Sequence, residues 1–179
     1  MRVLGIDPGS RRTGFGVVER DGNRFTCVVH GTVAPRSGLD LAGRLHAIAE
    51  RIDAVLAETR PDAVVVEEAF YHENVRSTLV LGHVRGALLL ISARAGVAVA
   101  EYSPREIKLS VTGNGGAAKE QVAFMVRRLL ALPEALQADA ADALAGAMCH
   151  LSRTRFSAPR RITPAGRRLE AMLAGRSPR

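Results

Sequence analysis

The feature that most constrains the fold is a run of four apolar residues in the middle of the chain, residues 63–66. An uninterrupted apolar run of this length predicts a strand that is buried on both faces of a sheet. The segments on either side, residues 39–59 and 74–94, place apolar side chains three and four residues apart, which predicts amphipathic helices. A buried strand between two such helices predicts an α/β fold with a mixed sheet covered by helices.

The remaining elements extend this pattern. A tight turn at Asp21-Gly22-Asn23 joins two alternating segments, which predicts an antiparallel hairpin. Ser103 followed by Pro104 has the form of a helix start, with serine as the N-cap and proline in the first turn. The predicted order is βββαβαβαα, with further strands over 3–7, 15–20, 24–33 and 97–102 and further helices over 118–131 and 138–151.

The net charge of +7 is distributed unevenly along the 179 residues. Residues 153–179 contain eight arginines and one acid, whereas residues 1–152 contain 17 basic and 17 acidic side chains. We therefore expect one folded domain over residues 1–152 and a flexible basic tail over residues 153–179. Of the 25 basic residues 23 are arginine, which suits bidentate contacts to phosphate and favours a polyanionic partner.

Several classes of protein are disfavoured by composition. No uncharged stretch exceeds about ten residues, so we expect no membrane-spanning helix. The apolar run that follows Met1 is too short for a signal peptide. Cys27 and Cys149 are far apart and form no CxxC motif, which argues against a zinc ribbon or a disulfide scaffold. A reducing cytoplasm is the expected location.

Four carboxylates stand at unusual places in this pattern. Asp7 and Glu67 each follow an apolar strand that is expected to be central in the sheet, so both side chains should meet at one sheet edge. Asp139 and Asp142 are three residues apart in an otherwise apolar segment, which places them on one face of a helix. Carboxylates that gather in this way repel one another unless a cation joins them, and an oxygen-only ligand set favours Mg²⁺ or Mn²⁺. Two such ions can hydrolyse a phosphodiester.

Each acid also has an ordinary structural interpretation. Asp7 precedes Pro-Gly and suits a turn, and Glu67 suits a solvated strand end. Asp139 as N-cap with Asp142 at the third helical position would resemble a capping box. The functional hypothesis therefore depends on all four acids together.

Four sequence blocks resemble the RuvC family of Holliday junction resolvases. They are GIDPGS at residues 5–10, GFG at 14–16, VEEAF at 66–70 and ADAADALA at 138–145. The resemblance runs from residue 1 to about residue 152, in the order and spacing of the family. It implies a ribonuclease H-like fold with a mixed five-stranded sheet, and a homodimer that nicks two opposed strands of a four-way DNA junction with Mg²⁺. It also implies a junction-binding protein and a branch-migration motor as partners.

The resemblance assigns roles to individual residues. It implies that Asp7, Glu67, Asp139 and Asp142 bind metal, that Lys108 and Lys119 lie near the cleaved strand, and that Phe70 lies beside the junction centre. Lys119 also follows a glycine-rich loop and opens a helix, where a lysine can stabilise charge on the reacting phosphate. Glu68 stands where some relatives have an amide.

Other residues are candidates for contact with DNA or with a second subunit. Arg11, Arg12, Arg76 and Arg85 are candidates for phosphate contacts, with ordinary surface charge as the alternative. The helix over 74–94 carries more apolar side chains than one sheet face requires, which a two-fold interface or burial within one subunit would explain.

Three other functions remain open at the level of sequence. A related ribonuclease H-like nuclease could act on RNA or on an RNA–DNA hybrid. A phosphotransferase of the sugar-kinase and actin type also begins its phosphate loop with D-x-G, but it requires two such domains. A non-catalytic junction-binding protein would use the arginines and leave the acids without a role.

Overall fold

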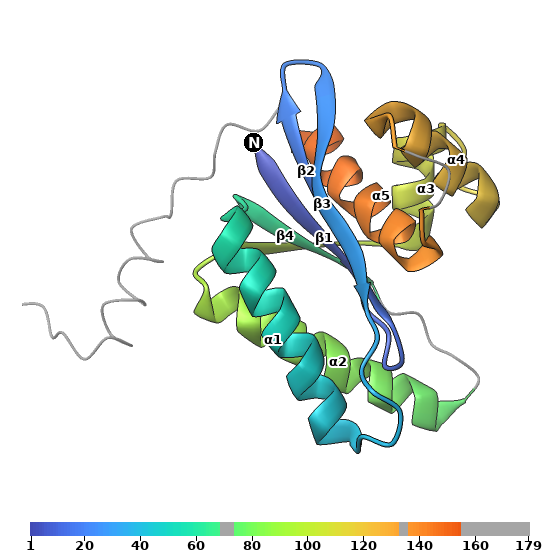
Figure 1. The fold of residues 1–179 in the computed structure, drawn as a ribbon. Helices are drawn as coiled ribbons and strands as arrows, with labels where there is room; N and C mark the ends of the chain where they lie inside the picture. Colours follow the sequence, from blue (N-terminus) through green and yellow to red (C-terminus); the bar gives the residue numbers. More distant parts are fainter. Residues whose placement is uncertain (69–73, 133–135, 155–179) are drawn as a thin grey trace, which may run out of the picture.

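The computed structural model describes residues 1–68, 74–132 and 136–154. Five strands form one mixed sheet, flanked by five helices in these described ranges (Figure 1). The strands are β1 (Arg2–Asp7), β2 (Thr13–Asp21), β3 (Arg24–Val33), β4 (Ala63–Glu67) and β5 (Ala98–Tyr102). The helices are α1 (Leu41–Thr59), α2 (Val75–Arg94), α3 (Pro104–Thr112), α4 (Lys119–Leu130) and α5 (Ala138–Arg153).

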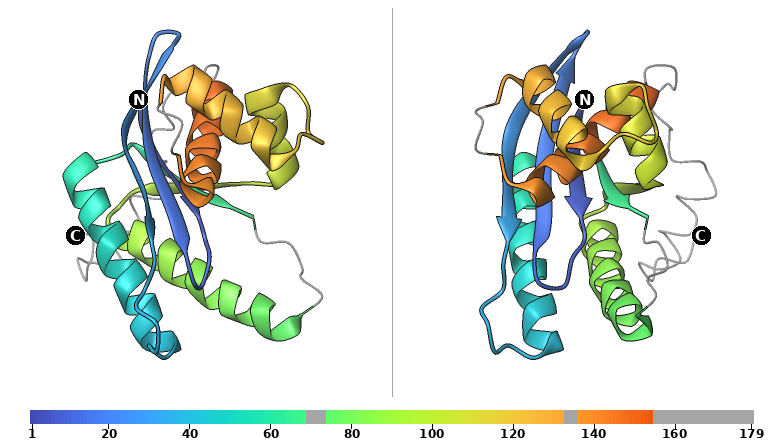
Figure 2. Two further views of the ribbon diagram at one scale, coloured as in Figure 1. Left: turned by 45° about the vertical axis from the view of Figure 1, so that its right-hand side comes forward. Right: turned by 90° about the vertical axis from the view of Figure 1, so that its right-hand side faces the viewer.

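The sheet has the order β3-β2-β1-β4-β5. β1, β2 and β3 form an antiparallel meander, while β4 pairs in parallel with β1 and β5 in parallel with β4. Helices α1 and α2 cover one face of the sheet, and α3, α4 and α5 cover the other (Figure 2). The predicted mixed five-stranded sheet flanked by helices is therefore confirmed.

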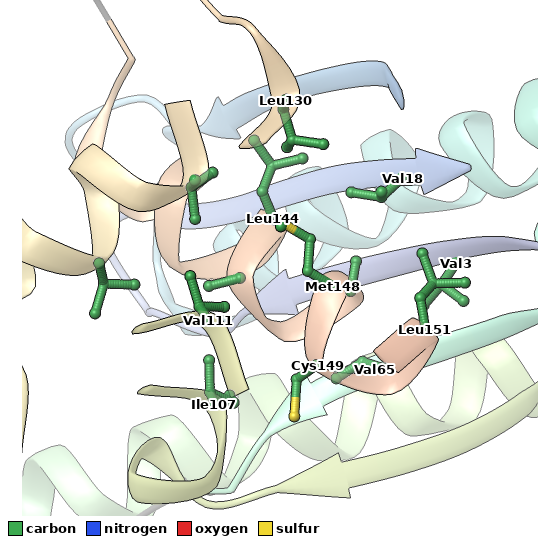
Figure 3. Packing of buried hydrophobic residues seen from close by; sticks show 14 of the residues in the cluster. Val3, Val18, Val65, Ile107, Val111, Leu130, Leu144, Met148, Cys149 and Leu151 are labelled. Carbon is green, nitrogen blue, oxygen red and sulfur yellow. The ribbon is translucent and has the colours of Figure 1, made fainter. Parts of the chain in front are cut away.

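The core lies in two layers, one on each face of the sheet. Val65 packs with Leu144 and Met148 of α5, whereas Val64 and Val66 pack beneath α1 and α2. Figure 3 shows the first of these layers, with Val65 and Met148 among its labelled side chains. The two-faced burial predicted for residues 63–66 is confirmed, since Val64, Val65 and Val66 are at most 1% exposed. Each such valine contributes about 1.5–3 kcal/mol relative to an exposed position.

Helix α2 does not agree with the expectation that the chain has no segment able to span a membrane. Within the described residues it is the one helix whose length and composition would allow it to cross a membrane. The arginines of α2 interrupt its apolar sequence, so a search for long uncharged stretches does not find this helix. Its mean hydropathy of 1.3 is nevertheless high enough for a membrane-spanning segment. However, Val84, Leu88 and Ile91 pack against the sheet, although only 22% of the apolar stretch of α2 is buried. Its opposite face leaves Val75, Leu79 and Leu90 60–61% exposed.

Candidate active site

Asp7 and Glu67 lie at the same edge of the sheet. β1 and β4 run in parallel with Ile6 opposite Val66. Asp7 follows Ile6 and Glu67 follows Val66, so the two acids lie side by side. The strands end here because Pro8-Gly9 turns the chain after Asp7, and the chain after Glu67 leaves the sheet. The predicted juxtaposition of these two carboxylates follows from the order of the strands.

Helix α5 approaches this edge closely because glycines on the sheet leave room for its backbone. A Cβ atom on Gly14 would lie 1.9 Å from the Asp139 carbonyl oxygen, and one on Gly5 would lie 1.9 Å from the Ala143 carbonyl oxygen. Alanine side chains on the facing side of α5 add little bulk. This contact brings the first two turns of α5, which carry Asp139 and Asp142, to the end of β1.

The capping interpretation of the α5 acids is wrong. Helix α5 begins at Ala138 with Gln137 as its N-cap, and no side chain caps it. Asp139 and Asp142 therefore lie within the helix, where their carboxylates are available for other contacts.

Three of the four predicted acids line one cavity together with both lysines of the chain. The cavity has a volume of about 210 Å³. Its polar lining consists of Asp7, Glu67, Asp142, Lys108 and Lys119. The Lys119 Nζ lies 3.4 Å from Asp142 Oδ2, and its side chain is 77% exposed. Lys119 can therefore move between this carboxylate and a ligand without losing buried contacts.

The carboxylates raise one another's proton affinity. Burial is the largest cause that raises the pKa of Asp7 to about 7, and the charges of Glu67, Asp142 and Asp139 contribute to this rise while Lys119 opposes it. Burial also raises the pKa of Glu67 and of Asp142. The pKa of Lys119 is raised chiefly by the charge of Asp142. Half-buried carboxylates of this kind are stabilised in their charged form by a bound cation.

Asp139 is not among the residues that line the cavity, and it pairs with an arginine. Its Oδ2 lies 3.0 Å from Nε of Arg12 in the turn between β1 and β2. Within the described ranges, no three Asp, Glu, His or Cys side chains are close enough together to form a ready-made metal site. The sequence predicts a four-carboxylate site but does not indicate this ion pair, because Arg12 and Asp139 are more than a hundred residues apart along the chain.

The remaining candidates have different surroundings. Arg85 on α2 donates hydrogen bonds to the Glu67 carbonyl oxygen and the Glu101 carboxylate, so it braces the end of β4 instead of facing DNA. Arg11 and Arg76 are exposed, the latter in the first turn of α2. Glu68 is exposed, and its N–H donates to the Tyr102 carbonyl oxygen at 3.0 Å. Phe70 lies outside the described residues.

The donor set suits a hard divalent cation. The acidic ligand atoms at this edge are all carboxylate oxygens, and neither cysteine lies among the residues that line the cavity. Oxygen-only sites favour Mg²⁺ or Mn²⁺ over zinc. A five-stranded mixed sheet with acids at the ends of adjacent central strands and on a crossing helix defines the class of ribonuclease H-like nucleases.

Comparison with known proteins identifies the family within this class. The family model described as crossover junction endodeoxyribonuclease RuvC matches residues 3–150. A RuvC of Pelobacter propionicus is 50% identical over 169 residues, which cover 91% of this chain and 96% of that protein. A RuvC of Geobacter metallireducens is 51% identical over 150 residues, which cover 84% of this chain and 92% of that protein. The chain belongs to the RuvC family of crossover junction endodeoxyribonucleases.

Solved structures agree with this assignment. The RuvC structure of Thermus thermophilus matches with a TM-score of 0.79 and 38% identity, over 87% of this chain and 96% of that one. The same protein in complex with a Holliday junction substrate matches with a TM-score of 0.82 and 38% identity, over 87% and 95% of the two chains. The ribonuclease H-like fold is thereby confirmed.

Proposed function

We propose that this protein is an endonuclease that resolves four-way DNA junctions by paired, Mg²⁺-dependent nicks in two opposed strands, during homologous recombination and DNA repair. The observation that carries the proposal is the cavity in which Asp7, Glu67 and Asp142 meet Lys108 and Lys119. A phosphodiester at this edge would meet a cluster of carboxylates and two cations. Membership of the RuvC family supports the four-way junction as its substrate.

We assign metal binding to Asp7, Glu67, Asp139 and Asp142, with two ions in each site. A bound divalent cation would lower the pKa of water and stabilise charge on the phosphate oxygens. Lys119 would leave Asp142 for the phosphate and stabilise the negative charge that develops there. Lys108, which lines the same cavity, would hold the cleaved strand. Asp139 joins the other acids once Arg12 releases it.

Contacts to DNA extend from this cavity. Arg11 and Arg12 on the turn between β1 and β2, and Arg76 at the start of α2, are assigned to backbone phosphates. The assignment of Phe70 to the junction centre stays a prediction from sequence. Residues 1–152 form the nuclease domain in this proposal, and residues 153–179 form a basic tail. Arg153 still belongs to α5 and pairs with Glu106, and residues 155–179 lie outside the described residues.

We assign the homodimer interface to the exposed face of α2. Leu79 and Leu90 are 60% and 61% exposed, and they stand on the same side of the helix as Gly82 and Gly86. Neither glycine meets any atom within 4 Å of an added Cβ, so another helix has room to approach. A homodimer through this face would bury the apolar surplus and place two active sites on two opposed strands.

A substitution on α2 tests the dimer. Leu79→Glu should convert the dimer into a monomer that nicks one strand of a junction and fails to pair the nicks. Leu109→Glu is the matched control, because Leu109 is 51% exposed on α3, away from α2. Light scattering measures the mass, and a cruciform plasmid distinguishes paired nicks from single ones. A dimer that survives Leu79→Glu would contradict this interface.

Direct comparison of substrates tests the function. We expect the protein to cut a synthetic four-way DNA junction in Mg²⁺ or Mn²⁺, and to leave linear duplex and chelator controls uncut. Faster cutting of an RNA–DNA hybrid would favour the related ribonuclease. Binding without cutting in either metal would favour a non-catalytic junction-binding protein.

The cellular setting is also part of the proposal. The protein would act in the cytoplasm, where a junction-binding protein and a branch-migration motor of the same pathway would deliver the junction. Cys27 and Cys149 are free thiols, which a reducing compartment would preserve.

A further inference from the structure

A second cavity lies beside the turn between β1 and β2, on the side of the sheet that carries α1. It has a volume of about 430 Å³ and includes Arg11, Arg36 and Arg44 among its lining residues. The rest of its wall comes from the loop between β3 and α1, where Gly38 turns the chain with φ of 88°. We call this cavity the arginine pocket. No acidic residue lines it.

The positive charge of the arginine pocket is not balanced locally. Arg11, Arg36 and Arg44 form no ion pair with any acid in the described part of the chain. Asp40 is the acid nearest along the chain to Arg36 and Arg44. It is the N-cap of α1 and accepts a hydrogen bond from the Gly43 N–H at 2.8 Å. An anion is therefore the ligand that this lining favours.

Arg44 joins the arginine pocket to the turn that ends at β2. Its Nη1 lies 3.5 Å from the Ser10 carbonyl oxygen. Its Nε is buried and has no hydrogen-bond partner in the described structure. A buried guanidinium nitrogen without a partner carries a desolvation cost, so the position of Arg44 is not explained by hydrogen bonds within the described residues alone.

The arginine pocket and the active-site cavity share one edge of the sheet. Thr13 at the start of β2 is paired with Val33 at the end of β3, so the loop that follows β3 begins beside the turn that follows Asp7. Within this turn Arg12 pairs with Asp139 on the α5 side, and Arg11 lines the pocket on the α1 side. Figures 1 and 2 show α1 and α5 on opposite faces of the sheet. A DNA strand that crosses this edge would meet both cavities.

We propose that Arg11, Arg36 and Arg44 form a second phosphate subsite, which binds one backbone phosphate of the cleaved strand to one side of the phosphate that is cut. The proposal rests on the proposed function and adds Arg36 and Arg44 to the residues that contact DNA. The subsite fixes the register of the strand across the sheet edge, and it carries no sequence preference because phosphates are alike at every position.

Salt-dependent binding tests the subsite in a protein that cannot cut. In an Asp7→Asn background, Arg36→Ala should weaken junction binding about tenfold and lower the slope of log Kd against log salt by about 1. Arg24→Ala is the matched control, because Arg24 is an exposed arginine at the start of β3, away from the pocket. Equal Kd and slope for Arg36→Ala and Arg24→Ala would overturn the proposal.

Neutral linkages locate the phosphate. A methylphosphonate placed singly along the cleaved strand should weaken binding by the Arg24→Ala protein at one position near the cut, and should leave binding by Arg36→Ala unchanged there. No such position would overturn the subsite. If inorganic phosphate stabilises Arg24→Ala but not Arg36→Ala against heat while junction binding is equal, the pocket takes a free anion and the proposal is wrong. The protein with native Asp7 is tested for junction cleavage in a separate experiment. Its result bears on the proposed function and not on the subsite.

Discussion

At the scale of single residues, two of the four acids at the site are paired with a cation and two are not. Arg12 neutralises Asp139, and Lys119 neutralises Asp142. Asp7 has no such partner, and its pKa is raised to about 7 by burial and by the neighbouring carboxylates. Of the four acids that the sequence grouped, Asp7, Glu67 and Asp142 line one cavity, whereas the pairing of Arg12 with Asp139 depends on a distance across the fold that no local pattern encodes.

The raised pKa of Asp7 predicts how stability depends on pH without metal. The folded protein holds this proton more tightly than the unfolded chain, where the pKa is 3.8, so stability should fall as pH rises from about 4 to about 7. Glu67 and Asp142, whose pKa values are also raised, act in the same direction. Denaturant unfolding in chelator at several pH values measures this, and Asp7→Asn should flatten the curve. An equal pH dependence in both proteins would contradict the assignment.

The ion pair between Arg12 and Asp139 predicts a competition with metal. Arg12→Ala should bind Mn²⁺ up to roughly fivefold more tightly in the absence of DNA, because a partly exposed ion pair is worth about 0.2–1 kcal/mol. Calorimetric titration measures the affinity, and Arg24→Ala is the control. Weaker binding by Arg12→Ala would mean that Arg12 holds Asp139 in place for the metal.

At the scale of elements, the position of α5 on the sheet decides whether its acids reach Asp7. The predicted strands and helices begin and end within two residues of the observed ones, as for residues 63–66. The predicted order was wrong in counting two helices after the last strand, because the helix start at Ser103 opens a third, α3. Spacing could not show that Gly5 and Gly14 would face the backbone of α5, because that contact joins segments more than a hundred residues apart. The sequence likewise does not indicate that Arg36, in the loop after β3, and Arg44, in α1, share a pocket with Arg11.

Gly14→Ala should displace α5 from the end of β1. The added Cβ would lie 1.9 Å from the Asp139 carbonyl oxygen, so we expect a loss of roughly 1–3 kcal/mol in unfolding free energy and weaker Mn²⁺ binding. Gly116→Ala is the control, since its Cβ would meet the Asn114 side chain at 3.4 Å. Denaturant unfolding and calorimetry measure the two effects. A stable Gly14→Ala protein with unchanged Mn²⁺ affinity would show that α5 tolerates displacement.

At the scale of the whole molecule, charge is divided between the folded domain and the tail. The excess of +7 lies within residues 153–179, so the DNA-facing potential of the domain depends on local segregation, as in the arginine pocket and around Lys108 and Lys119. Composition alone revealed the basic tail, whereas the segregation within the domain became visible only with the fold.

Removal of residues 157–179 should separate these contributions. We expect the shortened protein to cut a junction at the same rate when the DNA is saturating, because the active-site cavity lies within the domain. Binding should weaken and become less sensitive to salt, since six arginines are lost. Fluorescence anisotropy over a range of salt concentrations measures this. An unchanged slope would show that the tail takes no part in binding DNA.

The carboxylates at the sheet edge are expected to act in cutting the junction and not in binding it. The most direct measurement compares the native protein with Asp7→Asn on one labelled four-way junction, with binding and cleavage followed in Mg²⁺. The account predicts paired nicks from the native protein, and junction binding by Asp7→Asn with cleavage lost. Cleavage by Asp7→Asn at the native rate would contradict the account.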